Sequence, residues 1–312
     1  MIDIVLNFLE KYDIKNQKIG LAFSAGPDSC ALAYILNELK EKLNLQIVLC
    51  YFNHKWRKEA VLEEEFTKNL AQKFNFEYTI GKMPDNITKT EEFAREERYK
   101  FFEKVLKSFN MNYMLLGHNK DDNAETIIYR LIKGTSIKGL CAIKEKRGCY
   151  LRPLLEISKE EILNFLKENS QKYMIDISNN DTKYMRNFIR KEILPLFSKI
   201  NPNYLNSIHN FSKTCLHAQF MIDEMMSKVY QDLILDDVIQ KNKYIKLDIS
   251  YRLEFLNSFL GHKLKYRDYK TLKKLDDFIL NNITSMTSLN SKEFLKVRKD
   301  KIYIGETNVY DK

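Results

Sequence analysis

Short apolar runs alternate with amphipathic helical stretches through the first half of the chain, and this alternation indicates the fold class. The apolar runs that predict strands lie at residues 19–23, 47–51, 76–80 and 113–116. Helical patterns follow them at about 28–43, 62–74, 91–108 and 121–132. A repeated strand–helix order predicts a parallel sheet with helices on both faces. We therefore expect an α/β fold with a doubly wound, mostly parallel, Rossmann-like sheet.

The second part of the chain has a different character. Its 312 residues exceed the usual size of a single core. From about residue 201 the patterns are mostly helical, and two short apolar runs at 294–298 and 301–304 predict a terminal hairpin. We expect a larger domain over residues 1–212 and a smaller, mainly helical domain over 213–312.

Composition narrows the class of protein. The chain is 44% hydrophobic and 30% charged, which is typical of a globular protein. Its N-terminus reads as an amphipathic helix that contains acidic residues, not as a signal peptide, and no apolar run is long enough to span a membrane. The five cysteines include no Cys-x-x-Cys, which favours reduced thiols in the cytoplasm. A formal charge of +9 is compatible with a polyanionic partner.

Polar clusters follow three of the predicted strands, at residues 24–29, 53–57 and 117–126. Ligands of parallel sheets bind outside the carboxyl ends of the strands, so we expect these clusters to meet at one edge. The turn at 24–29 suits a phosphate, because Gly26 permits close backbone approach and Ser24 and Ser29 offer hydroxyls. An ordinary helix-capping turn explains this turn equally well. A Walker lysine and a G-x-G-x-x-G motif are both absent from the sequence.

The cluster at 117–126 carries acidic and histidine side chains. Asp121, Asp122 and Glu125 share a helix face, where they suit a magnesium ion or a substrate ammonium. Acidic residues also favour a helix N-terminus through the helix dipole, and this alternative needs no ligand. His54 and His118 are either acid–base groups or polar residues satisfied within the edge.

Together these residues resemble a known family. The segment Ser24-Ala-Gly-Pro-Asp-Ser29 is similar to the PP-loop, S-G-G-x-D-S, of the N-type ATP pyrophosphatases. Within that superfamily the chain resembles the tRNA(Ile)-lysidine synthetases over roughly residues 18–203, and beyond 203 it resembles their short form. The other matching stretches are Asn53-His54 through Arg57, Ala94-Arg95 through Arg98-Tyr99, Gly117-His118 through Asp121-Asp122 and Glu125-Thr126, Gly134 through Gly139-Leu140, Arg152-Pro153-Leu154, Asp176 through Ser178-Asn179, and Tyr184 through Arg186-Asn187 with Arg190 and Pro195.

The resemblance implies a ligase that splits ATP into AMP and pyrophosphate. In this family ATP adenylates the carbonyl oxygen on carbon 2 of the wobble cytidine of an isoleucine tRNA with a CAU anticodon. The ε-amine of free L-lysine then displaces AMP. The implied partners are therefore ATP with Mg²⁺, free lysine and this tRNA, in the cytoplasm and without a membrane.

The resemblance also assigns residues. It implies that ATP is held by Ser24, Ala25, Gly26, Pro27, Asp28, Ser29 and Arg95. Asp28 and Asp121 are the candidate magnesium ligands, and Asp122 and Glu125 are expected to bind the lysine ammonium. The candidate catalytic residues are Asp28, Asp122, Glu125, His54, His118 and Arg190. The candidate tRNA contacts are Arg186 and, in the second domain, Lys265, Arg267, Lys273 and Lys274, for which a solvated helix face is the alternative.

One position departs from the family pattern. Ala25 stands where the motif usually has glycine. If the backbone there has a positive φ, the methyl group costs on the order of 1 kcal/mol, whereas at a negative φ alanine is harmless.

Rival functions remain open at this point. A tRNA thiolase of the same superfamily is one, although such enzymes typically carry a Cys-x-x-Cys, and a relative fed by a glutaminase domain is another. A non-catalytic ATP sensor with a degenerate PP-loop is a third. The sequence does not decide the oligomeric state, a homodimer included, and it does not identify the group that removes the lysine proton.

Overall fold

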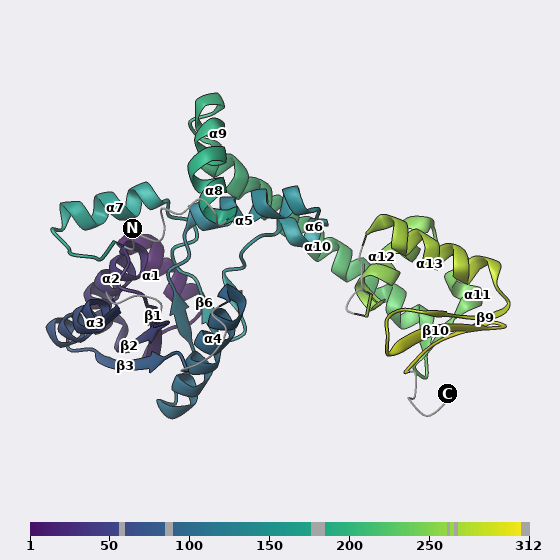
Figure 1. Ribbon diagram of the computed structural model, residues 1–312, viewed down its shortest axis with the longest axis horizontal. Helices are drawn as coiled ribbons and strands as arrows, with labels where there is room; N and C mark the ends of the chain where they lie inside the picture. Colours follow the sequence, from purple (N-terminus) through teal and green to yellow (C-terminus); the bar gives the residue numbers. More distant parts are fainter. Residues whose placement is uncertain (56–59, 85–89, 176–184, 261–262, 265–267, 307–312) are drawn as a thin grey trace. The chain divides into compact units, whose positions relative to one another are not determined.

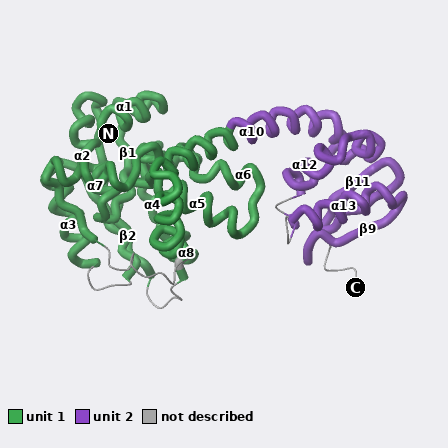
Figure 2. The backbone as a smooth tube through the Cα atoms, turned by 90° about the horizontal axis from the view of Figure 1, so that it is seen from above, with its two compact units in different colours: residues 1–216 green, residues 217–312 purple. Residues whose placement is uncertain are grey.

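The computed structural model describes residues 1–55, 60–84, 90–175, 185–260, 263–264 and 268–306. The chain divides into two compact units, Met1–Leu216 and His217–Lys312 (Figure 2). The boundary falls inside helix α10 (Tyr204–Leu233), close to the expected residue 212. Within the described residues, the search for a helix long and apolar enough to cross a membrane finds none. No disulfide joins any of the five cysteines, which all lie in those ranges.

The first unit is built on a six-stranded sheet. Its strands are β1 (Lys18–Phe23), β2 (Gln46–Asn53), β3 (Glu77–Lys82), β4 (Met114–Leu116), β5 (Lys146–Arg147) and β6 (Tyr150–Leu151). The strand order is β3-β2-β1-β4-β6-β5. Every neighbouring pair is parallel except β5 and β6, so the predicted mostly parallel sheet is confirmed.

Helices cover both faces of this sheet, as the alternation of patterns predicts (Figure 1). The helices of the first unit are α1 (Ile2–Lys11), α2 (Pro27–Leu43), α3 (Ala60–Phe74), α4 (Glu91–Ser108), α5 (Lys120–Lys133), α6 (Ile137–Leu140), α7 (Lys159–Glu168), α8 (Met185–Phe188) and α9 (Leu194–Ile200), with a π-helical turn η2 (Ile189–Ile193) between the last two. Helix α7 begins at a capping box, in which the Ser158 hydroxyl accepts from the Glu161 N–H and the Glu161 carboxylate accepts from the Ser158 N–H.

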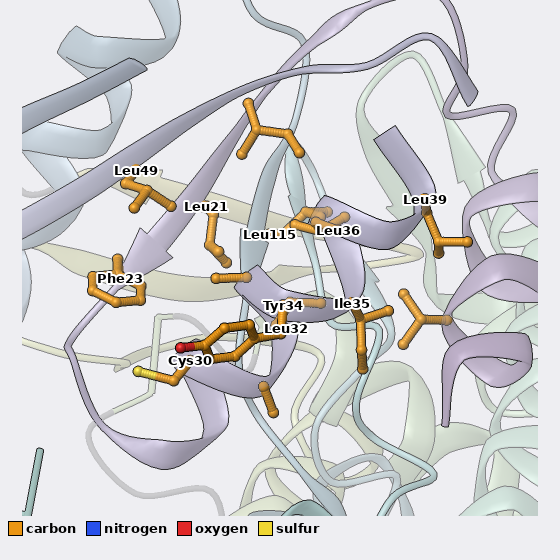
Figure 3. Packing of buried hydrophobic residues seen from close by; sticks show 14 of the residues in the cluster. Leu21, Phe23, Cys30, Leu32, Tyr34, Ile35, Leu36, Leu39, Leu49 and Leu115 are labelled. Carbon is orange, nitrogen blue, oxygen red and sulfur yellow. The ribbon is translucent and has the colours of Figure 1, made fainter. Parts of the chain in front are cut away.

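Two hydrophobic clusters fix the helices to the sheet. On one face, α2 places Leu32 and Leu36 among a core that includes Leu21 of β1 (Figure 3). On the other, α4 places Phe102 against a cluster that includes Met114 of β4. Because these side chains are almost fully buried, they fix α2 and α4 against opposite faces of the sheet.

The strand order reverses at β1, since the chain leaves β1 for β2 on one side and later returns to β4 on the other. Such a switch point opens a crevice between the loops that follow the two strands, where ligands of open α/β sheets bind. The loops concerned are residues 24–26 after β1 and 117–119 after β4.

The second unit combines helices with an antiparallel sheet. Its helices are the remainder of α10, α11 (Lys241–Tyr244), α12 (Ile249–Leu260) and α13 (Tyr269–Asn281), and its strands are β7 (Ile234–Leu235), β8 (Val238–Gln240), β9 (Thr284–Ser288), β10 (Glu293–Arg298) and β11 (Lys301–Glu306). The predicted hairpin is confirmed as β10 and β11 within a sheet of order β7-β8-β11-β10-β9. The other three strands escaped prediction because two of them are very short and β9 is polar.

Candidate active site

The loop between β1 and α2 has the features of an anion site. Gly26 caps α2 without a side-chain hydrogen bond, and Pro27 follows in the first turn. The first N–H groups of this long helix therefore point out of its N-terminus without a side-chain cap. The Ser29 hydroxyl accepts from the Ser24 N–H (3.2 Å) and donates to the Gly26 carbonyl (3.1 Å), which closes the loop on itself. This geometry suits a phosphate group.

Ala25 adopts a positive φ of 59° in this loop. Its side chain is fully buried, and its carbonyl accepts a hydrogen bond from the Met174 N–H at 2.8 Å. The sequence left the sign of φ open, and the structure places the residue in the left-handed region that favours glycine. The alanine methyl group is therefore a cost to folding at this position.

Asn119 joins the loop at residues 24–26, here called the phosphate-type loop, to the acidic cluster of α5, which consists of Asp121, Asp122 and Glu125. Its side-chain amide donates to Asp28 Oδ1 at 3.0 Å, and its backbone N–H donates to Asp122 Oδ2 at 3.0 Å. Its side-chain oxygen also accepts from the Asp122 N–H, which completes a capping box at the start of α5. Asn119 is only 3% exposed. The two predicted clusters thus meet through one buried side chain.

Gly117 explains how α2 and the end of β4 come so close together. A Cβ atom at this position would lie 3.2 Å from the Ser29 nitrogen and 3.3 Å from the Asp28 carbonyl carbon. Both neighbours are backbone atoms of the first turn of α2, so a side chain here would push that turn away. Glycine permits the close approach of backbone to backbone.

Lys159 binds the other side of Asp28. Its ammonium group donates to both carboxylate oxygens of Asp28 at 2.8 Å, and its backbone N–H donates to Asp121 Oδ2 at 2.7 Å. Asp121 therefore satisfies a backbone group at the N-terminus of α7. Asp28 and Asp121 are both held by the same lysine residue.

Arg190 pairs with the acidic residues of α5. Its Nε and one Nη donate to the two oxygens of Glu125 at 2.6 and 3.1 Å, and an Nη lies 3.6 Å from Asp122 Oδ1. Burial, followed by the neighbouring Glu125, raises the pKa of Asp122 to about 7. Burial also raises the pKa of Glu125, although Arg190 opposes this shift. Asp122 is therefore balanced between its charged and neutral forms near neutral pH.

The two candidate histidines lie at the same edge of the sheet. Burial, followed by the charge of Arg152, lowers the pKa of His118 to about 3, so its imidazole is neutral at physiological pH. His54 follows β2 and packs edge-on against Phe52, with ring centroids 5.0 Å apart. Arg95 and Arg186 are exposed, and both contribute to the charge that acts on His118.

A magnesium ion that binds with nucleotide phosphates takes only one or two carboxylates from the protein. Asp28, which lies in the first turn of α2, fits that requirement. Across the described ranges, no three His, Cys, Asp or Glu side chains gather into a metal site. These residues thus suit a magnesium ion that arrives with its phosphates rather than one held by the protein alone.

The predicted tRNA contacts of the second unit are only partly described. Lys265 and Arg267 lie outside the described residues, as do Arg57, Asp176, Ser178, Asn179 and Tyr184 among the stretches that carry the resemblance. Lys273 pairs with Asp277 at 2.9 Å and with the buried Asp276 at 3.5 Å. Lys274 is exposed.

Sequence reasoning assigned no role to Asn119, Lys159 or Arg152. The capping-box spacing of Asn119 and Asp122 was a usable signal for the first. Nothing local in the sequence places Lys159 beside Asp28, because 131 residues separate them.

Comparison with known proteins agrees with this architecture. The PP-loop domain family matches residues 3–197. A tRNA(Ile)-lysidine synthase from Francisella tularensis subsp. tularensis (strain WY96-3418) is 32% identical over 252 residues, which are 78% of this chain and 62% of that protein. The protein of the same name from Clostridium perfringens (strain ATCC 13124) is 32% identical over 300 residues, or 92% of this chain and 63% of that protein.

The chain thus spans about three fifths of the length of these relatives. Among solved structures, the U34-tRNA thiolase NcsA from Methanococcus maripaludis shares the fold, with a TM-score of 0.56 and 20% identity over 69% of this chain and 78% of that one. The family match covers more than half of the chain, including the loop, the acidic helix and the strands between them. The chain belongs to the PP-loop domain family.

Proposed function

We propose that the chain is a tRNA(Ile)-lysidine synthase. In this reaction ATP adenylates the carbonyl oxygen on carbon 2 of the wobble cytidine in an isoleucine tRNA with a CAU anticodon, and pyrophosphate leaves. The ε-amine of free lysine then attacks carbon 2. A carbon–nitrogen bond forms, the bond between carbon 2 and oxygen breaks, and AMP leaves with that oxygen. Adenylation is needed because the cytosine carbonyl oxygen is by itself a poor leaving group.

The observation that carries the proposal is the position of Asn119 between Asp28 and Asp122. The first reaction step needs a site for the phosphates of ATP, and the second needs an anionic site for an amine. Asp28 begins the helix that follows the phosphate-type loop, and Asp122 begins the acidic helix. A cytosine ring bound beside these two carboxylates is within reach of both ATP and lysine, which is the requirement of catalysis by proximity.

The acidic pair supplies two different groups to lysine. Glu125 is held by two hydrogen bonds from Arg190 and is the anion that we assign to binding of the lysine ammonium. Asp122 has a pKa of about 7, which matches the requirement for a base at neutral pH. We assign to Asp122 the acceptance of the proton that the ε-amine must lose before or during attack.

The remaining assignments follow the same logic. Ser24, Gly26 and Ser29 hold the triphosphate, and Asp28 is a ligand of the magnesium ion, which neutralises phosphate charge when bound. Arg186 and Lys274 are exposed cations that we assign to tRNA phosphates, together with Lys265 and Arg267. Because tRNA is the substrate, we place the reaction in the cytoplasm.

Two other functions compete with this one. A tRNA thiolase has the same fold, but the sequence contains no Cys-x-x-Cys to carry sulfur. A non-catalytic ATP sensor would be favoured by the strained Ala25, but such a protein has no need of a carboxylate whose pKa is raised to about 7, as that of Asp122 is. Formation of AMP separates a sensor from an enzyme.

The test is incorporation of radiolabelled lysine into tRNA. The purified chain is incubated with ATP, Mg²⁺, labelled lysine and a transcript of isoleucine tRNA with a CAU anticodon, and a methionine tRNA transcript serves as the control. We expect label in the isoleucine tRNA, AMP in equal amount, and neither product with Asp122→Asn. Release of AMP without transfer of lysine, or no turnover at all, would overturn the proposal.

A further inference from the structure

Three polar atoms, on β6 itself and on the residues that follow β4 and β6, are buried without a hydrogen-bond partner in the described part of the chain. They are His118 Nδ1, Tyr150 Oη and Arg152 Nε. Arg152 is only 5% exposed. Buried polar atoms are nearly always hydrogen-bonded, so three unsatisfied ones in a group point to a ligand that supplies their partners.

The sheet brings these three side chains to one place. β4 and β6 pair in parallel, with Met114 opposite Tyr150 and Leu115 opposite Leu151. Successive side chains alternate between the faces of a sheet, so Tyr150 and Arg152 share a face. Tyr150 belongs to the same buried cluster as Met114, on the side covered by α4. His118 follows directly after the end of β4.

Helix α4 adds an aromatic ring and a further cation to this group. The Tyr99 ring packs edge-on against Tyr150, with centroids 4.9 Å apart. Arg95 donates to the Tyr99 hydroxyl at 3.3 Å, and its guanidinium group lies 5.0 Å from the centre of the Tyr99 ring. Arg95 is thereby positioned beside the buried group instead of extending freely into solvent.

Several arginines surround this group, and ion pairs to carboxylates are absent for three of them within the described residues. The charges that act on His118, after burial itself, are those of Arg152, Arg95, Arg98 and Arg186. Among the described residues, no ion pair joins Arg95, Arg152 or Arg186 to a carboxylate, whereas Arg190 has two such partners. A buried guanidinium without an anion is costly, which favours an anionic ligand.

We propose that Arg152, Tyr150 and His118, together with Arg95, form a second phosphate-binding site beside the PP-loop. It lies at the ends of β4 and β6, and β4 is the direct neighbour of β1 in the sheet. The inference rests on the proposed function for the source of the phosphate. That source is either a phosphodiester of the tRNA strand at the target cytidine or a phosphate of ATP.

A purely structural role for Arg152 is the alternative. Its Nη1 donates to the Lys144 carbonyl at 2.8 Å, which ties down the segment before β5. Tyr150→Phe separates the two roles, because it removes only the unpartnered hydroxyl and leaves Arg152 and its carbonyl contact in place. We expect this variant to fold about as well as the wild-type chain, because, among the described residues, the only neighbour of the lost hydroxyl that raises its pKa through a hydrogen bond is the weakly bonding Cys149 thiol.

The experiment measures two affinities for the full chain. One is for the isoleucine tRNA transcript without ATP over a range of salt concentrations, and the other is for ATP with Mg²⁺ without tRNA. The variants are Tyr150→Phe and Arg152→Gln, with Arg147→Gln, an exposed arginine of β5, as the control. A melting curve for each variant establishes that it is folded.

If the phosphate belongs to tRNA, Arg152→Gln weakens tRNA binding about 10- to 100-fold. It also lowers the slope of log affinity against log salt by about 1 and leaves ATP affinity unchanged. If the phosphate belongs to ATP, Arg152→Gln weakens ATP binding by a similar factor and leaves the tRNA affinity and its salt dependence unchanged. Tyr150→Phe weakens the same affinity as Arg152→Gln, but by a smaller factor. Arg147→Gln changes neither affinity.

Folded Tyr150→Phe and Arg152→Gln variants that keep both affinities within about twofold of wild type would overturn the inference. This outcome is distinct from failure of the proposed function. In that case the wild-type chain transfers no lysine to tRNA, whatever the two binding measurements show.

Discussion

Asn119 donates a 3.0 Å hydrogen bond to Asp28 Oδ1, and this contact joins the helix after β1 to the helix after β4. The two residues lie 91 positions apart in the chain. Lys159 completes the arrangement from a third element, because its ammonium group bridges both oxygens of Asp28. The Asp28 carboxylate, in the first turn of α2, is thus oriented by Asn119 and Lys159 from two other segments. Catalysis by preorganised groups requires such orientation.

Asn119→Ser should separate the two roles of Asn119, which are capping of α5 and orientation of the Asp28 carboxylate. Serine is as good an N-cap as asparagine but is too short to reach Asp28. We expect a melting temperature close to that of wild type and a fall in kcat/KM for ATP of about tenfold, the equivalent of one lost hydrogen bond of about 1.4 kcal/mol. Asn119→Ala is the matched control, and it should lose a further ~1 kcal/mol of stability with the cap. Equal activity in wild type and Asn119→Ser would show that the bond to Asp28 has no catalytic role.

Ala25→Gly should stabilise the protein. Alanine at a φ of 59° is strained, and glycine removes this strain at a smaller cost in the entropy of the unfolded chain. We expect a gain of about 0.5–1 kcal/mol, measured as a rise in the melting temperature of the first unit. Ala31→Gly is the control, because Ala31 is buried in the regular part of α2 and should lose about 1 kcal/mol or more. A lower melting temperature for Ala25→Gly would contradict the strain.

Asp122→Asn should trade activity for stability in a pH-dependent manner. The folded protein holds a proton on Asp122 up to a pKa of about 7, far above its ordinary value of 3.8. The contribution of this group to stability is therefore complete below about pH 4 and is lost as the pH rises through 7. Asparagine cannot ionise, so the variant should melt a few degrees higher than wild type at pH 8.

The same comparison at pH 5 provides the internal control. Most of the gain should disappear there, because wild-type Asp122 is then protonated and resembles the amide. Melting curves at both values check the sign. A gain that grows as the pH falls would mean that the pKa of Asp122 is depressed, and this would also remove the basis for assigning it as the proton acceptor.

The sequence predicted the sheet because the strands that form it are apolar runs with clear helical patterns between them. Helix α4 was predicted at residues 91–108, the bounds it has in the structure, since periodicity is a local property of the chain. The meeting of Asp28 with Asp122 followed from topology, because loops after parallel strands share one edge. The structure adds Asn119 as the physical link between them.

Other features had no local signal. The positive φ of Ala25 runs against the preference of alanine for negative φ, and its carbonyl is bonded by Met174 from a distant part of the first unit. The buried position of Arg152 depends on the pairing of β6 with β4, where β6 is only two residues long. Such short strands are formed by tertiary contacts and cannot be recognised from their own residues.

Lys159→Met should reveal whether Lys159 and magnesium compete for Asp28. The ammonium group donates to both oxygens of that carboxylate, so a cation that binds Asp28 must displace it. Without the ammonium group, the half-saturating concentration of Mg²⁺ should fall. Once magnesium displaces it from Asp28, the Lys159 ammonium group is free to pair with the triphosphate, so its removal should also raise the KM for ATP about tenfold. Lys167→Met, in the last turn of the same helix, is the control and should change neither value. A half-saturating Mg²⁺ concentration that stays constant or rises in Lys159→Met would mean that Asp28 is not a ligand of the metal, and the magnesium site would then have to be sought among other carboxylates.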